Sequence, residues 1–301
     1  MMENYLKRHR GIMSDKRYDN ILLISDLDGT LFGLTHQAGR EVLSSVRMAC
    51  DSGRHFALAT GRTVRSSAAV GFGDVPVEVV CANGAIILGR DGSIVHHVPM
   101  DPAFIEELLV AFPELPLEFV TLDHTLERRS RKESEAARLR MSLVRRIVLR
   151  GMTRDGGERL YGQTPDEICS QVVVKVNYRT EPGDDEVRER LASFVAAHAD
   201  QAVNAPFSRR MFEITDPTAT KAEGVAWLAR QLGLANDEVA VYGDGGNDLS
   251  MLRRFEHSYA PRGALEEAKR SANVVIGSNV LYAVPRHVKA TVRHEGPFQV
   301  P

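Results

Sequence analysis

The 301-residue sequence has few cysteines and no long apolar segment, and both absences argue against whole classes of protein. Its three cysteines, Cys50, Cys81 and Cys169, are odd in number and far apart, with no Cys-x-x-Cys pair. This pattern argues against a disulfide framework or a zinc site and fits a reducing compartment. No apolar run approaches the roughly 20 residues that span a bilayer. We therefore expect a cytoplasmic protein without a membrane partner.

The N-terminal residues 1–20 lack the apolar core of a secretory signal and are polar and basic instead. We expect them to form a partly disordered lead-in, with Met13 as an alternative start. The length suits one large domain or two ordinary ones, and the sequence contains no internal repeat or low-complexity segment. The oligomeric state stays open.

A strong net charge is also absent, since the formal value is −2 at pH 7. The chain as a whole therefore gives no reason to expect nucleic acid as a partner. One local exception is residues 128–150, with nine Arg or Lys and two Glu. A solvated helix face explains them most simply, and an anionic substrate, an oligomer contact or RNA are the alternatives. RNA is the weakest of these because no aromatic residues are interleaved for base stacking.

The stretch around which the chain is organised begins with the apolar run Ile21–Ile24, which suits a buried strand of a parallel sheet. It ends at two aspartates one residue apart, Asp26 and Asp28, and Gly29 then permits a sharp turn. Strand side chains alternate, so residues i and i+2 point to the same side. Two neighbouring carboxylates repel, and a divalent cation would offset that repulsion. The alternative is a turn with both acids solvated.

Further short strands alternate with helices on either side of the sequence centre, which predicts an α/β fold with a parallel sheet in three layers. Apolar spacing predicts helices at 37–52 and 221–232, and helical residues after Arg62. The predicted strands each end in polar or glycine-rich residues: 55–59 before Thr60-Gly61-Arg62, 78–82 before Asn83-Gly84, and 238–242 before Gly243-Asp244-Gly245-Gly246-Asn247-Asp248.

The pattern changes in the middle of the chain. A hairpin signal at Asp91-Gly92, an alternating strand at 171–178 and helices at 101–112, 131–149 and 186–197 predict an α+β region with an antiparallel sheet. From Met211 the α/β pattern returns. We therefore predict an α/β core formed by residues 21–86 and 207–301, with a second domain, residues 87–206, inserted into it.

Several chemically active side chains follow the ends of predicted strands, and in a doubly wound sheet these ends converge on one crevice. Carboxylates suit Mg²⁺. A lysine, a hydroxyl group and backbone amides at helix starts suit a phosphate. A site that holds both indicates phosphoryl transfer, with one carboxylate as nucleophile and the other moving a proton. The members are Asp26, Asp28, Thr60, Gly61, Arg62, Lys221, Asp244, Asn247 and Asp248.

In this order, Asp26-Leu27-Asp28-Gly29-Thr30, Thr60-Gly61-Arg62, Lys221 and the 243–248 loop resemble the four signature motifs of the haloacid dehalogenase superfamily. The length of the inserted segment, together with Ala82-Asn83-Gly84-Ala85, resembles the Cof-type phosphatases, which carry a type-two cap over a Rossmann-like core. The resemblance covers residues 21 to about 290. Two departures are Ala222, where relatives commonly have glycine, and Pro261-Arg262-Gly263-Ala264, where many relatives carry Met-Gly-Asn-Ala.

The resemblance implies a role for each matching residue. Asp26 is expected to be the nucleophile and a Mg²⁺ ligand, and Asp28 the general acid and base, with its backbone carbonyl on the metal. Asp244 is expected to be the acidic metal ligand, supported by Asp248. The residues expected to hold the phosphoryl group are Thr60, Gly61, Lys221, Asn247 and, more loosely, Arg62.

The implied function is a Mg²⁺-dependent phosphatase that hydrolyses a small phosphorylated metabolite, a sugar phosphate above all, through an aspartyl-phosphate. A phosphomutase or phosphotransferase needs the same four motifs and remains an alternative. A catalytically silent phosphosugar-binding module would lack at least one chemical residue, and all are present. Within the inserted domain, Lys175, Asn177 and the region of Asn204 are candidates for substrate contact.

Overall fold

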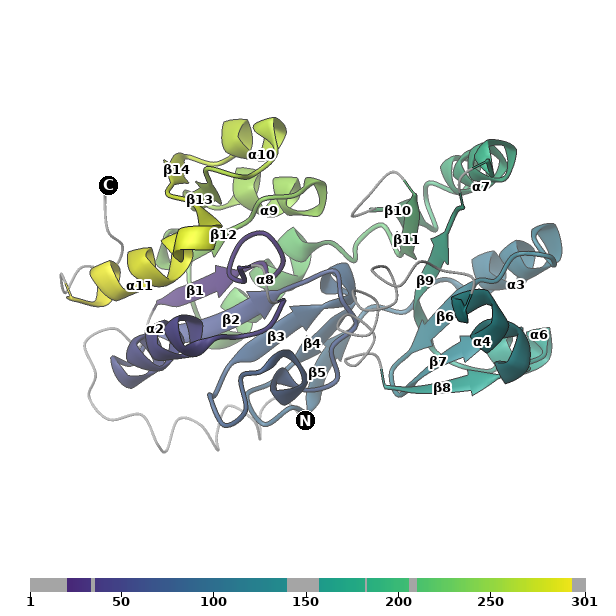
Figure 1. Cartoon of the computed structure of the whole chain (residues 1–301), viewed down its shortest axis with the longest axis horizontal. Coiled ribbons are helices and arrows are strands. Elements are labelled where there is room, and N and C mark those ends of the chain that lie inside the picture. Colours follow the sequence, from purple (N-terminus) through teal and green to yellow (C-terminus); the bar gives the residue numbers. More distant parts are fainter. Residues whose placement is uncertain (1–20, 34–35, 140–156, 182, 206–209, 294–301) are drawn as a thin grey trace. The chain divides into compact units, whose positions relative to one another are not determined.

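The computed structural model describes residues 21–33, 36–139, 157–181, 183–205 and 210–293. The chain divides into two compact units (Figure 1). We call residues 1–96 and 220–301 the core unit and residues 97–219 the insert unit. Within the described residues, no helix is both long and apolar enough to cross a membrane.

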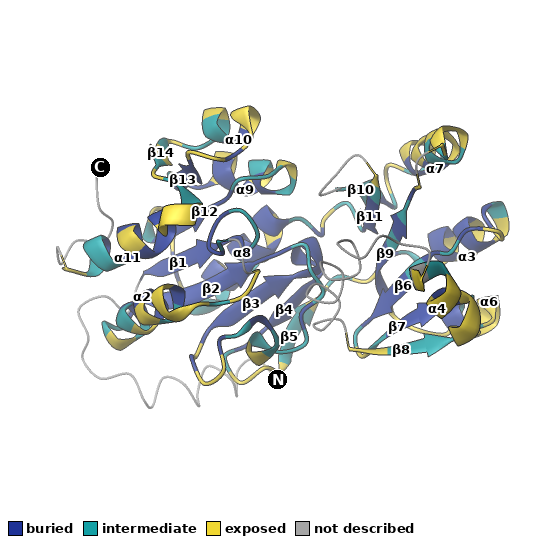
Figure 2. Ribbon diagram, viewed as in Figure 1, coloured by how far each residue is buried: buried dark blue, intermediate teal, exposed yellow. Residues whose placement is uncertain are grey.

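The core unit contains an eight-stranded sheet in the order β14-β13-β12-β1-β2-β3-β4-β5. Neighbouring strands from β14 to β3 run parallel, and β4 pairs antiparallel to β3. The strands are β1 (Leu22–Ser25), β2 (His55–Ala59), β3 (Glu78–Cys81), β4 (Ile86–Leu88), β5 (Ile94–His97), β12 (Val239–Tyr242), β13 (His257–Pro261) and β14 (Val274–Ile276). All four residues of β1 are fully buried, as expected for a strand covered on both faces (Figure 2).

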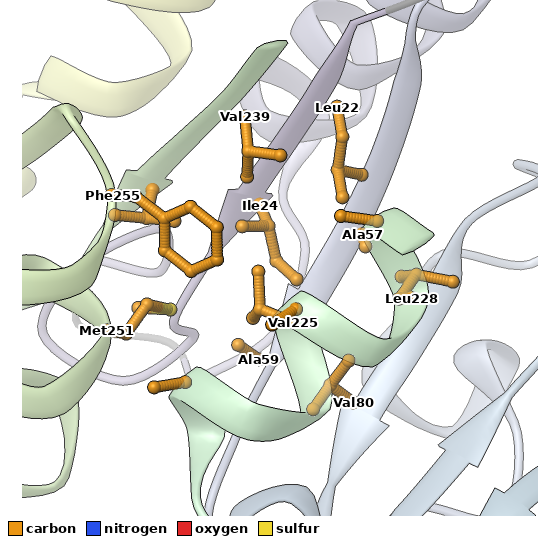
Figure 3. Close-up of a cluster of buried hydrophobic side chains, with 14 of the residues drawn as sticks. Leu22, Ile24, Ala57, Ala59, Val80, Val225, Leu228, Val239, Met251 and Phe255 are labelled. Atoms are coloured by element: carbon orange, nitrogen blue, oxygen red, sulfur yellow. The ribbon is translucent and has the colours of Figure 1, made fainter. Parts of the chain in front are cut away.

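Helices cover both faces of this sheet. On one face, α8 (Lys221–Leu232), α9 (Leu249–Arg254) and α10 (Glu266–Ser271) contribute to an apolar cluster with alternate residues of β1, β2 and β12, such as Leu22 and Ile24 (Figure 3). On the opposite face lie α2 (Arg40–Asp51) and α11 (Ala283–Arg293), which pack against each other. The predicted three-layer α/β architecture is confirmed, and it fixes the carboxyl ends of the central strands.

The insert unit has a six-stranded sheet in the order β10-β11-β9-β6-β7-β8, antiparallel except for the β7–β8 pair. Three helices, α3 (Pro102–Ala111), α6 (Pro165–Cys169) and α7 (Asp185–Ala197), contribute buried apolar residues to one cluster with these strands. The strands are β6 (Glu118–Thr121), β7 (His124–Glu127), β8 (Glu158–Tyr161), β9 (Val173–Arg179), β10 (Val203–Asn204) and β11 (Met211–Thr215). The predicted α+β character of this region is confirmed.

Both predicted boundaries of the insert unit differ from those in the structure. The β4–β5 hairpin extends the core sheet, so the first boundary lies at 96/97 and not at 86/87. Strand β11 pairs with β9 of the insert sheet, so the second boundary lies at 219/220. Its predicted position, 206/207, falls among residues outside the described ranges. An apolar strand pattern shows that a strand exists but not which sheet it joins.

Two predicted helices also differ. The helical residues expected after Arg62 form only a short 3-10 helix, η1 (Ser67–Val70). The basic helix expected at 131–149 is seen as α4 (Arg131–Leu139), and its continuation lies outside the described residues. The apolar residues Ala136 and Leu139 of this helix are exposed, whereas Ser134 is buried and donates a hydrogen bond of 2.6 Å to Glu127. Within the described part of this helix, a side-chain hydrogen bond therefore links it to strand β7 of the insert sheet.

Candidate active site

The residues predicted to form a site lie at the carboxyl edge of the core sheet. Asp26 and Asp28 follow β1, Thr60 follows β2, and Asp244 follows β12, while Lys221 is the first residue of α8. Strands β2, β1 and β12 are adjacent and parallel, so their ends meet at one edge. Side chains separated by more than 200 residues in the sequence are thereby brought into contact, as the bond from Thr30 Oγ1 to Asp244 Oδ1 (2.5 Å) demonstrates.

Glycines make this convergence possible at two places. Gly29 has a φ of +85°, and a Cβ placed there would overlap the carboxylate of Asp244. Gly84 has a φ of +104°, and its Cβ would overlap the carbonyl of Thr220, the residue that caps α8. Any side chain at either position would therefore displace Asp244 or the start of the helix that carries Lys221.

Lys221 is the central cation of the site. Its ammonium group donates to Asp26 Oδ1 at 2.6 Å and to Asp248 Oδ1 at 2.7 Å. All three residues are at most 6% exposed. Lys221 therefore joins the end of β1 to the loop that follows β12, and it holds the predicted nucleophile in one orientation.

Asp248 accepts hydrogen bonds from the backbone of its own loop, residues 243–248, and from Lys221. Its Oδ2 accepts hydrogen bonds from the backbone N–H groups of Asp244 (2.9 Å) and Gly245 (2.8 Å), while its Oδ1 accepts from Lys221. With both oxygens engaged, Asp248 shapes the 243–248 loop and aligns Lys221. This agrees with the supporting role expected for it more closely than with direct metal ligation.

The electrostatics of this cluster favour an additional cation. Burial, which removes the carboxylate from water, raises the pKa of Asp26 well above its ordinary value despite the opposing effect of Lys221. Burial likewise raises the pKa of Asp244 to about 6, although the hydrogen bond from Thr30 counteracts it, and repulsion from Asp248 adds to the rise. The pKa of Lys221 is raised because attraction by Asp248 and Asp26 outweighs its burial. One lysine does not balance three carboxylates.

The donor set fits Mg²⁺. Oxygen atoms of Asp26, Asp244 and Asp248 lie within 4.8 Å of one another, and hard divalent cations prefer such carboxylate ligands. Asp26 and Asp244 are the two members best suited to bind the ion, given the bonds that engage Asp248. The carboxylate of Asp28, also predicted near the metal, is not part of this cluster. The role expected for its backbone carbonyl stays a prediction.

Asp28 is instead held by two basic side chains. The guanidinium of Arg62 binds it in a bidentate manner, with Nε to Oδ2 at 2.7 Å and Nη2 to Oδ1 at 2.5 Å. The ring Nδ1 of His36 lies 2.7 Å from the same Oδ1. Arg62 was predicted, loosely, to contact the phosphoryl group, and here its guanidinium fixes the orientation of the predicted acid and base.

The predicted phosphate residues lie beside this pair. Thr60 is 1% exposed, and its hydroxyl oxygen accepts the backbone N–H of Arg62 at 3.1 Å. Gly61 lies against two carboxamides, because a Cβ there would come 2.8 Å from Asn83 Oδ1 and 3.2 Å from Asn247 Nδ2. Thr60, Gly61 and Asn247 are thus gathered at the ends of β2 and β12, where the sequence predicts them.

Three residues that contact the site were given no role from sequence. Thr30 binds Asp244, His36 binds Asp28, and Asn83 accepts a hydrogen bond of 3.1 Å from Asn247. Thr30 lies within the first motif, and Asn83 precedes a glycine at the end of a strand, so both carried a usable signal. His36 lies in a loop without a regular pattern, so nothing in the sequence distinguished it.

Comparison with known proteins agrees with this arrangement. Residues 23–285 match the family model for haloacid dehalogenase-like hydrolases. Phosphatase YwpJ of Bacillus subtilis (strain 168) is 23% identical over 289 residues, which cover 89% of this chain and 98% of YwpJ. The matched region includes every residue of the predicted site.

Solved structures share the fold. A haloacid dehalogenase-like hydrolase from B. subtilis superposes with a TM-score of 0.76 at 23% identity, covering 89% of this chain and 98% of that one. The HAD subclass IIB sugar phosphatase BT4131 superposes with a TM-score of 0.71 at 18% identity, covering 92% and 100%. The predicted Cof-type fold, with a parallel core and an inserted α+β unit, is therefore confirmed.

These findings establish the family of the chain. The family match spans far more than half of the sequence, and the signature residues meet at one edge of the core sheet. The predicted enzyme class, a haloacid dehalogenase-type phosphoric monoester hydrolase, is confirmed at the level of this family. The chain belongs to the haloacid dehalogenase-like hydrolase family.

Proposed function

We propose that this hydrolase is a Mg²⁺-dependent phosphatase that cleaves a small phosphorylated metabolite through an aspartyl-phosphate intermediate. The observation that carries the proposal is Lys221, buried between Asp26 and Asp248, with Asp244 beside them. A self-contained structural ion pair needs no third carboxylate. A crevice that binds a metal ion next to a phosphoryl group does need an additional carboxylate, because the metal ion requires negatively charged ligands.

In the proposed reaction Asp26 attacks phosphorus, so that a bond forms between its carboxylate oxygen and phosphorus while the ester bond to the leaving oxygen breaks. Asp28, once protonated and released from the guanidinium of Arg62, gives its proton to that leaving oxygen. Asp28 then takes a proton from water, whose oxygen attacks phosphorus and releases inorganic phosphate and the Asp26 carboxylate. The bidentate contact with Arg62 orients Asp28 before the reaction, and it must open at one oxygen for each proton transfer.

Charge neutralisation supports these steps. Lys221 orients Asp26, and its positive charge offsets that of the incoming phosphoryl oxygens. In the described part of the chain no acceptor lies against the hydroxyl hydrogen of Thr60, which leaves it to donate to a phosphoryl oxygen. When bound by Asp26 and Asp244, Mg²⁺ supplies further positive charge next to the phosphoryl group.

A sugar phosphate is the substrate class we propose. The support is the resemblance to Cof-type enzymes and the fold shared with BT4131, itself a sugar phosphatase. Of the insert residues predicted to contact substrate, Lys175 is ion-paired with Glu213, and Asn204 Oδ1 accepts the backbone N–H of Glu213 at 2.9 Å. Asn177 differs, because its buried Oδ1 has no partner among the described residues, and we retain it as the proposed substrate contact.

Cellular location and partners complete the proposal. Cys50, Cys81 and Cys169 form no disulfide, which supports a reducing, cytoplasmic location. The partner we propose is the phosphorylated small molecule alone, without nucleic acid or membrane.

The test is a panel of phosphorylated sugars, polyols, nucleotides and pyridoxal phosphate, together with p-nitrophenyl phosphate. We expect inorganic phosphate release that requires Mg²⁺ and stops with a chelator. Release from a hexose phosphate without a bisphosphate activator distinguishes the hydrolase from a phosphomutase. Absence of release from every ester, with Mg²⁺ present and the protein folded, would contradict the proposal.

A further inference from the structure

Asn83, at the end of β3, has a buried carboxamide that the chemistry above does not use. The residue is 1% exposed, and its Oδ1 accepts a hydrogen bond of 3.1 Å from Asn247 Nδ2. Its own Nδ2 is buried and has no hydrogen-bond partner among the described residues. A buried donor left unpaired costs about 1–3 kcal/mol, so such groups usually have a ligand or function to account for them.

The backbone that presents this carboxamide is unusual. Ala82, Asn83 and Gly84 all have positive φ values, of 50°, 59° and 104°. For residues other than glycine this conformation is uncommon and costs on the order of 1–3 kcal/mol, and it clusters at functional sites. It is held by Asn83 N–H donating to Thr60 O (3.1 Å) and Ala82 N–H donating to Arg62 O (2.8 Å). The turn is therefore built directly onto the Thr60–Arg62 segment.

The orientation of the carboxamide is fixed on one side only. Because Oδ1 is engaged by Asn247, the NH₂ group must be the end that lacks a partner. Gly61 contributes the space, since any Cβ there would lie 2.8 Å from Asn83 Oδ1. The carboxamide thus stands between Gly61 and Asn247, both predicted to hold the phosphoryl group, and beside Thr60.

We propose that the Asn83 carboxamide donates a hydrogen bond to a phosphoryl oxygen in the core crevice, and that its bond to Asn247 fixes both amides for that task. The inference rests on the proposed function, because it takes the ligand to be a phosphoryl group. Asn83, which follows β3, would then bind the phosphoryl group together with the residues that follow β2 and β12. The left-handed backbone conformation of residues 82–84 places the Asn83 side chain next to Gly61 and Asn247.

Two substitutions test the proposal with inorganic phosphate as the probe. Asn83→Asp keeps an acceptor for Asn247 but removes the donor, whereas Asn83→Gly removes the whole side chain and suits the left-handed backbone. The matched control is Asn236→Asp, which adds the same charge at an exposed position of the core unit. Phosphate affinity is measured in the presence of Mg²⁺ by calorimetry and as product inhibition of p-nitrophenyl phosphate hydrolysis.

We expect Asn83→Gly to weaken phosphate binding roughly 10- to 150-fold, the range for loss of a hydrogen bond to a charged group. Asn83→Asp should weaken it further through repulsion, and Asn236→Asp should leave it unchanged. Unchanged affinity in both folded Asn83 variants would overturn the assignment, as would loss in Asn83→Gly alone, which would mean that Asn83 only orients Asn247. Absence of both phosphate binding and hydrolysis in the unaltered protein would overturn the proposed function together with this inference.

Discussion

Each unit of the molecule contains a lysine that is 1% exposed, and the two are surrounded differently. In the insert unit, Lys175 lies in the middle of strand β9 and is ion-paired with Glu213 of the neighbouring strand β11. In the core unit, Lys221 lies at a helix start between Asp26 and Asp248, with Asp244 close to both carboxylates. Burial of a lysine is therefore not the feature that marks a site.

The difference lies in the surplus of negative charge. A buried ion pair such as that of Lys175 and Glu213 does not by itself indicate a functional site, because structural ion pairs are also buried. Around Lys221 the carboxylates outnumber the lysine, and their raised pKa values record the cost. Such a surplus of buried carboxylates is typical of a site that binds a cation or catalyses phosphoryl transfer.

The largest expected effect is the loss of Asp26. Asp26→Asn should reduce turnover of p-nitrophenyl phosphate on the order of 10⁴-fold or more, because the nucleophile is removed. The matched control is Asp74→Asn, whose carboxylate is exposed and pairs with Arg47 on the surface. Substantial residual turnover in Asp26→Asn would mean that another group attacks phosphorus.

The next largest effect concerns Asp28 and the residue that holds it. Asp28→Asn should reduce kcat roughly 10²- to 10⁴-fold, the usual contribution of general acid–base catalysis. Arg62→Lys loses the bidentate contact and should lower kcat by a smaller factor, with little change in KM if Arg62 acts through Asp28. A large rise in KM with unchanged kcat would instead assign Arg62 to direct binding of the phosphoryl group.

Substitution of Lys175 should affect stability alone, whereas substitution of Lys221 should affect both stability and turnover. Lys175→Met should lower the free energy of unfolding by about 3–5 kcal/mol, because the buried carboxylate of Glu213 loses its ion pair with Lys175. The double variant Lys175→Met with Glu213→Leu should recover most of that loss. Lys221→Met should lose turnover as well as stability. Urea unfolding and p-nitrophenyl phosphate hydrolysis measure the two quantities.

One result would contradict the structural role assigned to Lys175. If Lys175→Met keeps its stability but changes which phosphate esters are hydrolysed, the ion pair with Glu213 is not structural, and Lys175 belongs to substrate recognition.

The smallest effect is the pH dependence of stabilisation by Mg²⁺. Because the pKa of Asp244 is raised to about 6, its folded form retains a proton that the unfolded chain loses near the ordinary value. Its contribution to the unfolding free energy therefore falls as pH rises between about 4 and 6. Mg²⁺ requires the deprotonated carboxylate, so its stabilising effect should grow across this window.

At a hundredfold excess over its dissociation constant the ion should add about 2.7 kcal/mol, equivalent to several degrees in melting temperature. Thermal unfolding with and without Mg²⁺ at pH 5 and pH 7 tests this. The gain should be larger at pH 7 and should largely vanish in Asp244→Asn. An equal gain at both pH values would place the ion elsewhere.

The sequence was sufficient for the parts of the molecule that local patterns determine. The apolar run of β1 and the carboxylates that follow it, the glycine-rich loop after β12 and the helix beginning at Lys221 were predictable, because strand ends in a parallel sheet converge. The pairing of β11 with β9 was not, since the Met211–Ile214 pattern suits either sheet. The position of the Asn83 amide depends on the left-handed backbone conformation of residues 82–84 and on a hydrogen bond from Asn247, 164 positions away. No local sequence pattern encodes either of these.

The claim on which everything else depends is that Asp26 becomes phosphorylated. The direct measurement is rapid acid quenching of the enzyme during turnover of p-nitrophenyl phosphate with Mg²⁺, followed by mass spectrometric mapping of the covalent phosphoryl group. We predict modification of Asp26 in the unaltered protein and none in Asp26→Asn. Steady turnover with the phosphoryl group on another residue, or undiminished turnover in Asp26→Asn, would contradict the mechanism.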